Sequence, residues 1–117
     1  MSDATGKATT IETRGSAVIA RPQVKMLDDK ETKLLAQAID TAAPEGSGAS
    51  LVVIDLSAVA IVPSLALGVL VQIVNRCKAR QQKLKLSGVQ PQVRQVFAIT
   101  KLDRVFELAS SVDEALK

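Results

Sequence analysis

The chain has 117 residues and a formal net charge of +3, and 47% of its residues are hydrophobic although only 2% are aromatic. This length fits one domain with a single core, which must be aliphatic. With no histidine and one cysteine, the usual general base for a serine or cysteine nucleophile is missing and an intrachain disulfide is impossible. No residue spacing suggests a metal site. We therefore expect a non-enzymatic protein without a metal or cofactor.

Basic residues concentrate between Arg76 and Lys85, at the expected end of a helix. Cations complement the helix dipole there, which favours an ordinary solvated helix end; a patch for nucleic acid or anionic lipid is the alternative. The scarcity of aromatic side chains argues against single-stranded nucleic acid, which binds by stacking. The N-terminus has no apolar signal-peptide core, and the apolar run 65–71 is too short to span a bilayer. We expect a cytoplasmic protein that does not bind nucleic acid or insert into a membrane.

The N-terminal part predicts a tail followed by a pair of short strands. Residues 1–9 are small and polar, as in a disordered tail. Ala17–Ala20 predicts a strand, with a partner strand around Thr10–Thr13 across an intervening turn. The segment Arg21-Pro22-Gln23 then ends the second strand.

The middle of the chain predicts two helices around a central strand. The first helix is expected near Asp28, whose spacing to Glu31 forms a capping box, and a loop at 44–48 ends it. The run Leu51–Leu56 lacks polar alternation until its last residues, which is typical of a strand covered on both faces. A second helix is expected from about Ser64 to Gln81, with the single cysteine on its inward stripe.

The C-terminal part continues the alternation of strands and helices. Leu84–Ser87 predicts a strand, Pro91 suits the first turn of a third helix, and Leu102–Leu108 predicts a turn and a last strand. The spacing of Ser111 to Glu114 forms a second capping box, which opens a terminal helix. This order predicts a single α/β domain with a mixed sheet of four to five strands and about four flanking helices.

From Leu51 onward the sequence resembles a known family, the STAS domain, which is the fold of bacterial anti-sigma-factor antagonists. The resemblance rests on the segments VVIDLS, AVAIVPSLALG, LSGVQPQVRQVF and ITKLDRVFELASSVDEAL, in this order. It covers roughly residues 10–117, so it implies one STAS domain over 10–117 after the tail at 1–9.

The resemblance draws attention to the start of the second helix. The family's motif at this junction usually reads Asp-Ser-Ser-Gly-Leu-Gly, and a partner kinase that is also the anti-sigma factor phosphorylates its first serine. Here the six positions read Pro63-Ser64-Leu65-Ala66-Leu67-Gly68. Ser64 falls on the phosphoacceptor position, while Pro63, Leu65 and Ala66 depart from the motif.

Ser64 therefore has two interpretations. It is a plain helix N-cap, with its side-chain oxygen accepting from the amide of Ala66 or Leu67, or it is a phosphoacceptor within a partner-binding surface. In the family the loop after the second strand also contributes to partner contact. The implied contact residues are Arg21, Pro22, Gln23, Pro63, Ser64, Leu65, Ala66 and Gly68.

The resemblance implies an anti-sigma-factor antagonist in a partner-switching pathway. Its partner would be an anti-sigma factor with serine kinase activity, and a metal-dependent serine phosphatase would reset the switch. The alternative is a constitutive, non-phosphorylated STAS scaffold, such as a subunit of a sensory assembly or of a lipid-transporting ABC complex. The departures at Pro63, Leu65 and Ala66 favour this alternative, whereas the hydroxyl of Ser64 favours the switch.

Overall fold

Five strands form one mixed sheet whose spatial order is the order of the chain. The computed structural model describes residues 9–117. The strand β1 runs antiparallel to β2, and every later strand runs parallel to its neighbour. The strands are β1 (Thr9–Arg14), β2 (Ala17–Pro22), β3 (Leu51–Asp55), β4 (Lys83–Ser87) and β5 (Glu107–Ala109).

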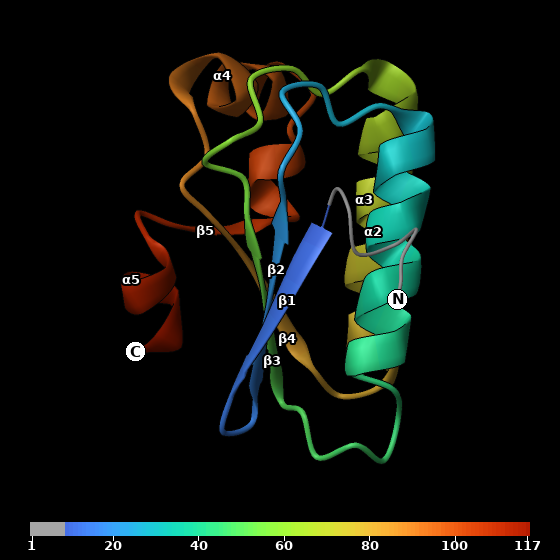
Figure 1. Ribbon diagram of the computed structural model, residues 1–117. Coiled ribbons are helices and arrows are strands. Elements are labelled where there is room, and N and C mark those ends of the chain that lie inside the picture. Colours follow the sequence, from blue (N-terminus) through green and yellow to red (C-terminus); the bar gives the residue numbers. More distant parts are fainter. Residues whose placement is uncertain (1–8) are drawn as a thin grey trace.

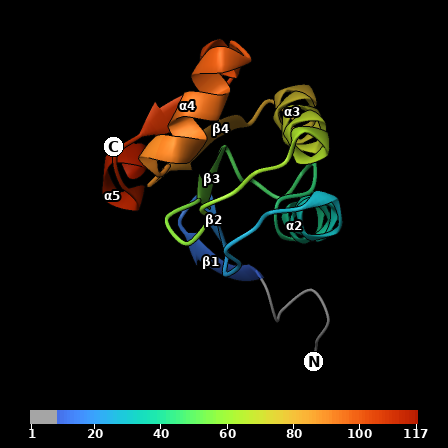
Figure 2. The same ribbon diagram turned by 90° about the horizontal axis from the view of Figure 1, so that it is seen from above.

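The helices are divided between the two faces and one end of this sheet. The helices α2 (Asp29–Ala42) and α3 (Ser64–Ala79) pack side by side on one face, and the short helix α5 (Val112–Leu116) covers part of the other (Figures 1 and 2). The helix α4 (Pro91–Ile99) lies across the end of the sheet that is at the top of Figure 1. A turn of 3-10 helix, η1 (Leu102–Arg104), links α4 to β5. The expected α/β fold with a mixed sheet and four helices is therefore confirmed.

The central strand β3 is buried on both faces, as its apolar run predicts. Val52 and Ile54 belong to the main core under α2 and α3. Val53 points to the other face, where it packs with Ile19 and with Ala115 of α5. Because successive side chains of a strand alternate between faces, a central strand with a helix on each side has no place for polar residues.

The capping residues of two helices agree with the sequence. The carboxylate of Asp28 accepts a hydrogen bond from the amide of Glu31 at 2.8 Å, and the hydroxyl of Ser111 accepts one from the amide of Glu114 at 3.2 Å. Each side chain satisfies one of the amides that a helix start leaves unpaired. The N-cap half of each expected capping box is therefore confirmed. Among the described residues, neither Glu31 nor Glu114 accepts the reciprocal hydrogen bond from the amide of the cap residue.

Other boundaries differ slightly from those expected. The first strand begins at Thr9, and the rest of the expected tail, residues 1–8, lies outside the described residues. The helix α3 ends at Ala79 rather than near Gln81 because Gln81 adopts a left-handed conformation with φ of 62°. A residue in that conformation cannot continue a right-handed helix. Among the residues that the structure describes, no helix is long and apolar enough to cross a membrane.

Candidate functional site

Two loops meet at the end of the sheet where the parallel strands finish, beside the start of α3 (Figure 1). The β2–α2 loop and the β3–α3 loop are joined by backbone hydrogen bonds. The amide of Leu27 donates to the carbonyl of Ile61 at 2.9 Å, and the amide of Ala60 donates to the carbonyl of Lys25 at 2.7 Å. In open parallel sheets, ligands commonly bind at this carboxyl end. The structure therefore joins the loop that follows Gln23 to the loop that precedes Pro63, at the end of the sheet where ligands commonly bind.

The start of α3 differs from the expectation that the side chain of Ser64 caps the helix. The N-cap residue is Pro63, which has an extended backbone with φ of −64° and ψ of 160° and provides no side-chain hydrogen bond. Its carbonyl accepts from the amides of Ala66 at 3.0 Å and Leu67 at 3.2 Å. Ser64 is already the first helical residue, so the interpretation as a side-chain cap was wrong. The reason is that the extended proline immediately before it occupies the cap position.

Ser64 is exposed at the positive end of the helix. In the part of the chain that the structure describes, the amides of Ser64 and Leu65 have no hydrogen-bond partner. The first turn of α3 contains no acidic residue. Unpaired amides and the helix dipole both stabilise negative charge, so a phosphate on Ser64 is compatible with the folded chain.

Exposed apolar side chains lie beside this serine in the chain and on the loop paired with its own. Leu65 is 77% exposed, Ile61 is 47% exposed and Met26 is 46% exposed. Met26 and Ile61 pair in an isolated parallel bridge between the two loops. We call Met26, Ile61, Ser64 and Leu65 the Ser64 surface. Exposed apolar residues gathered in one place are typical of a protein-binding surface.

Sequence analysis did not single out Met26 and Ile61. One signal was available: both are large apolar residues within loops. Neither belongs to the helical or strand periodicity that would assign it to the core. Which of several apolar loop residues is exposed depends on tertiary packing. Leu27 and Val62, each adjacent in sequence to one of them, are buried.

The residues implied as partner contacts do not all reach the surface. Gln23, Ser64, Leu65 and Gly68 are exposed and Pro63 is half-buried. Pro22 and Ala66 are buried, so their side chains do not belong to the exposed surface at this site. The side chain of Ala66 faces the core because it lies on the buried face of α3, and Pro22 is the last residue of the inner strand β2.

Arg21 is engaged within the protein rather than free for a partner. Its guanidinium lies 2.6 Å from the carboxylate of Glu12 and 3.4 Å from that of Asp55, and its side chain is 27% exposed. Arg14 also contacts Glu12. The two arginines hold the pKa of Glu12 below its ordinary value, mainly through the hydrogen bond from Arg21 and then that from Arg14. Arg21 therefore joins β1, β2 and β3 at the base of the site.

The β4–α4 loop supports the β3–α3 loop from below. The carboxylate of Asp55 accepts from the amide of Ser57 at 3.0 Å, and the side chain of Gln90 donates to the carbonyl of Ser57 at 2.8 Å. Gly88 passes so close that a Cβ there would lie 3.0 Å from the Cβ of Ser57. These contacts fix the start of the loop that carries Ile61 against Gly88 and Gln90.

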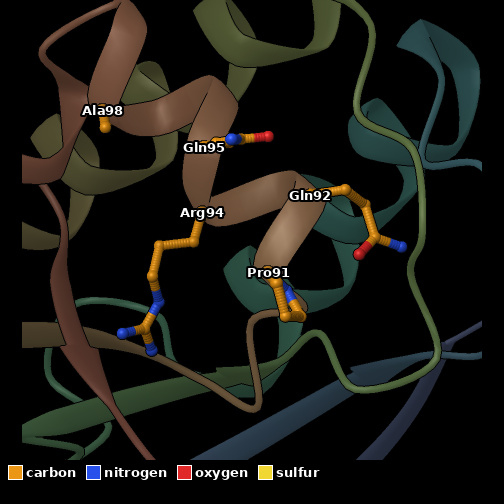
Figure 3. A pocket seen from close by; sticks show the side chains of 5 residues that line it. All are labelled: Pro91, Gln92, Arg94, Gln95 and Ala98. Carbon is orange, nitrogen blue, oxygen red and sulfur yellow. The ribbon is translucent and has the colours of Figure 1, made fainter.

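A shallow groove of about 570 Å³ lies on the outer face of α4. Figure 3 shows that the side chains of Gln92 and Arg94 leave this helix on different sides. Gln92 donates to the side chain of Gln90 at 2.8 Å. All the lining residues are exposed and belong to one helix, so this groove is an open surface and not an enclosed site. They are Pro91, Gln92, Arg94, Gln95 and Ala98.

Comparison with known proteins gives consistent matches over nearly the whole chain. A family model described as the STAS domain matches residues 8–115. A Thermotoga maritima protein considered a candidate anti-sigma factor antagonist has a TM-score of 0.82 at 21% identity, covering 96% of this chain and 94% of its own. An anti-sigma-factor antagonist (STAS) domain protein from Planctomyces limnophilus has a TM-score of 0.76 at 28% identity, covering 92% and 93%. The anti-sigma factor antagonist SpoIIAA in its unphosphorylated form has a TM-score of 0.74 at 21% identity, covering 93% of each chain.

Proposed function

Because this chain belongs to the STAS domain family, we propose that it is an anti-sigma-factor antagonist that acts by binding another protein through the Ser64 surface. The observation that carries this proposal is the exposed serine at the first turn of α3, followed by the exposed Leu65 and preceded by a loop whose exposed Ile61 pairs with Met26. Two similar proteins described as anti-sigma-factor antagonists support the proposal: the one from Planctomyces limnophilus and SpoIIAA. The chain would work in the cytoplasm by binding rather than by catalysis.

The proposed partner is an anti-sigma factor that is also a serine kinase. It would transfer the γ-phosphoryl group of ATP to the hydroxyl oxygen of Ser64, releasing ADP and the hydroxyl proton. A metal-dependent serine phosphatase would hydrolyse the phosphoserine to serine and inorganic phosphate. Exposure of Ser64 makes its hydroxyl accessible to such enzymes without unfolding of α3.

The proposed effect of phosphorylation follows from the chemistry of the surface. A phosphate adds a charge of about −1.5 to −2 at neutral pH. The free amides of Ser64 and Leu65 would stabilise this charge in the unbound protein. Burying it against a partner beside Leu65 and Ile61 would cost desolvation free energy, because apolar neighbours provide no hydrogen bonds. Phosphorylation would thus release the partner while the chain stays folded.

A constitutive STAS module is the second candidate, as a scaffold subunit of a sensory assembly or of a lipid-transporting ABC complex. The observation that favours it is Pro63 at the N-cap, where the family motif has an aspartate. A proline offers a kinase neither the carboxylate nor the backbone amide of an aspartate. In this case the same apolar surface would bind its partner permanently, and Ser64 would stay unmodified.

The deciding experiment is capture of partners from the native cell by four forms of the chain: wild type, Ser64→Ala, Ser64→Asp and Leu65→Asp. We expect wild type and Ser64→Ala to retain a kinase-like partner, and Ser64→Asp and Leu65→Asp to lose it. Intact mass should show one phosphate on wild type and none on Ser64→Ala. Ser47→Asp and Ile99→Asp are matched controls, because Ser47 is an exposed serine in another loop and Ile99 is 80% exposed on α4.

The possible outcomes separate the candidates. If Ser64→Asp retains the same partner and no phosphate is found, release of the partner by phosphorylation of Ser64 is rejected. The constitutive module is then supported. If Leu65→Asp retains the partner as well as Ile99→Asp does, the Ser64 surface is not the binding site.

A further inference from the structure

The cations between Arg76 and Lys85 do not form one solvated face. Arg76 and Arg80 both contact the carboxylate of Asp40, which joins α3 to α2. Lys85 donates to the carbonyl of Ala115 at 3.2 Å and lies 3.6 Å from the carboxylate of Glu107. Lys78 and Lys83 are exposed and have no ion pair among the residues described here. These two cations therefore require a separate explanation.

Lys78 and Lys83 lie on the rim of a groove together with Arg104 of η1. The groove has a volume of about 420 Å³ and lies between α3, the start of β4 and the η1–β5 connection. Its apolar lining includes Val74 and Phe106, which are 4% and 3% exposed, and Val105, which is 39% exposed. We call this surface the basic groove. The helix dipole of α3 explains a cation at Lys78, but not the convergence of cations from two other elements.

The backbone at the groove suits an extended peptide. The strand β5 pairs only with Lys85, Leu86 and Ser87 of β4, so the first two residues of β4, Lys83 and Leu84, extend beyond this pairing. Both of these residues line the groove. The amide of Lys83 donates to the carbonyl of Ser50 on the β3 side at 2.9 Å, so of these two residues only Leu84 turns its backbone groups toward the groove. Leu84 offers these groups to an extended segment, whose alternate side chains would face the apolar lining.

We propose that the basic groove binds an extended acidic peptide segment of a second protein, with an apolar side chain against Val105 and carboxylates at Lys78, Lys83 and Arg104. The only acid lining the groove, Glu107, is next to Lys85, so the rim is positively charged and complements such a peptide. A membrane surface fits less well because Val74 and Phe106 are recessed between the cations. Nucleic acid fits less well because the buried ring of Phe106 cannot stack on a base.

This groove is far from the Ser64 surface. Lys78 lies fourteen residues after Ser64 on the same helix, a separation of about 21 Å at 1.5 Å per residue. The two surfaces therefore lie toward opposite ends of α3 (Figure 1). An acidic segment in the basic groove would leave the Ser64 surface free, so the chain could connect two proteins.

The test is a titration of the isotope-labelled chain with the synthetic peptide Glu-Glu-Val-Glu-Val-Glu-Glu, followed by amide chemical shifts at low salt. We expect the largest shifts at Lys83, Leu84 and Val105, with affinity that falls steeply as salt is added. Lys83→Glu and Arg104→Glu should each weaken binding at least fivefold. The matched control Lys30→Glu changes the same charge at an exposed position on α2 and should have little effect.

Three results would overturn the proposal. The first is equal loss of affinity in Lys30→Glu and Lys83→Glu, since only net charge would then matter. The second is equal binding of a peptide with glutamine in place of every glutamate. The third is groove-dependent binding of phosphatidylglycerol vesicles or duplex DNA without binding of the acidic peptide. Leu65→Asp should bind the peptide normally, so failure of the Ser64 surface and failure of the basic groove can be told apart.

Discussion

Met26 and Ile61 face each other in a single parallel bridge between the β2–α2 and β3–α3 loops. Neither loop has regular secondary structure of its own, yet the bridge and its flanking hydrogen bonds fix their relative position. About half of each side chain is exposed. A partner that binds the proposed Ser64 surface would therefore meet a preorganised pair of apolar side chains and would need to order little of the loop backbone, which would reduce the entropic cost of binding.

Replacing either member of this pair with serine should weaken partner binding more than it weakens the fold. We expect Met26→Ser and Ile61→Ser to lower affinity at least tenfold. The free energy of unfolding should fall by only about 1 kcal/mol, because half of each side chain is already in water. Partner affinity and urea denaturation measure the two effects. Ile11→Ser, at a 39% exposed position on β1, should leave affinity unchanged, and equal loss there would contradict the assignment.

Removal of the Asp28 cap should destabilise the chain. Asp28→Ala leaves the amide of Glu31 without its partner, and we expect the free energy of unfolding to fall by about 1 kcal/mol. Urea denaturation gives the value. Asp29→Ala is the control, since Asp29 lies in the same turn and only makes an exposed ion pair with Lys33. A loss in Asp29→Ala as large as in Asp28→Ala would show that charge near the helix start matters more than the cap.

Gly88 should tolerate no side chain. It has φ of +64°, and a Cβ would lie 3.0 Å from the Cβ of Ser57 and 3.1 Å from a carboxylate oxygen of Asp55. We expect Gly88→Ala to cost about 2 kcal/mol or more, from backbone strain together with this crowding. Gly46→Ala tests the strain alone, because Gly46 also has a positive φ but nothing lies within 4 Å of its Cβ position. Thermal denaturation of both variants should show a clearly larger loss for Gly88→Ala.

The ion pairs of Glu12 should make stability depend on acid pH. Because Arg21 and Arg14 lower the pKa of Glu12 in the folded chain, folding is favoured above the ordinary pKa of a glutamate. That contribution is lost as pH falls through the lowered value. At pH 7 the melting temperature of wild type should therefore be higher than that of Glu12→Gln. The difference between the two melting temperatures should shrink below about pH 4. Glu45→Gln, in an exposed loop, is the control, and a gap that stays constant with pH would contradict the role of ionised Glu12.

Cys77 should be unreactive in the folded chain. Its side chain is 1% exposed, and burial raises the pKa of its thiol. At pH 8 we expect a disulfide reagent to modify it only at the rate of opening or unfolding of the chain. The same reagent should react at once in denaturant. Rapid reaction without denaturant would show that α3 opens locally at its C-terminal turns.

The local signals in the sequence predicted much of the fold. Asp28 and Ser111 cap the helices that follow them because a cap is formed by residues three positions apart. The burial of Leu51–Leu56 on both faces follows from its lack of polar alternation. The cap of α3 was missed because Pro63 and Ser64 are adjacent and both suit a helix start. Which of them is the first helical residue depends on the backbone conformation of the preceding loop. That conformation is set by its pairing with the β2–α2 loop.

The sequence by itself determined the α/β order of the chain, the N-caps at Asp28 and Ser111, and the segments that resemble the STAS domain. The tertiary structure decided which side chains meet. Ala66 and Pro22 are buried, and Arg21 forms ion pairs within the sheet. Met26 pairs with Ile61, 35 positions later in the chain. The physical reason is that periodicity and capping act over a few neighbouring residues, whereas a binding surface is assembled from loops joined by long-range backbone pairing.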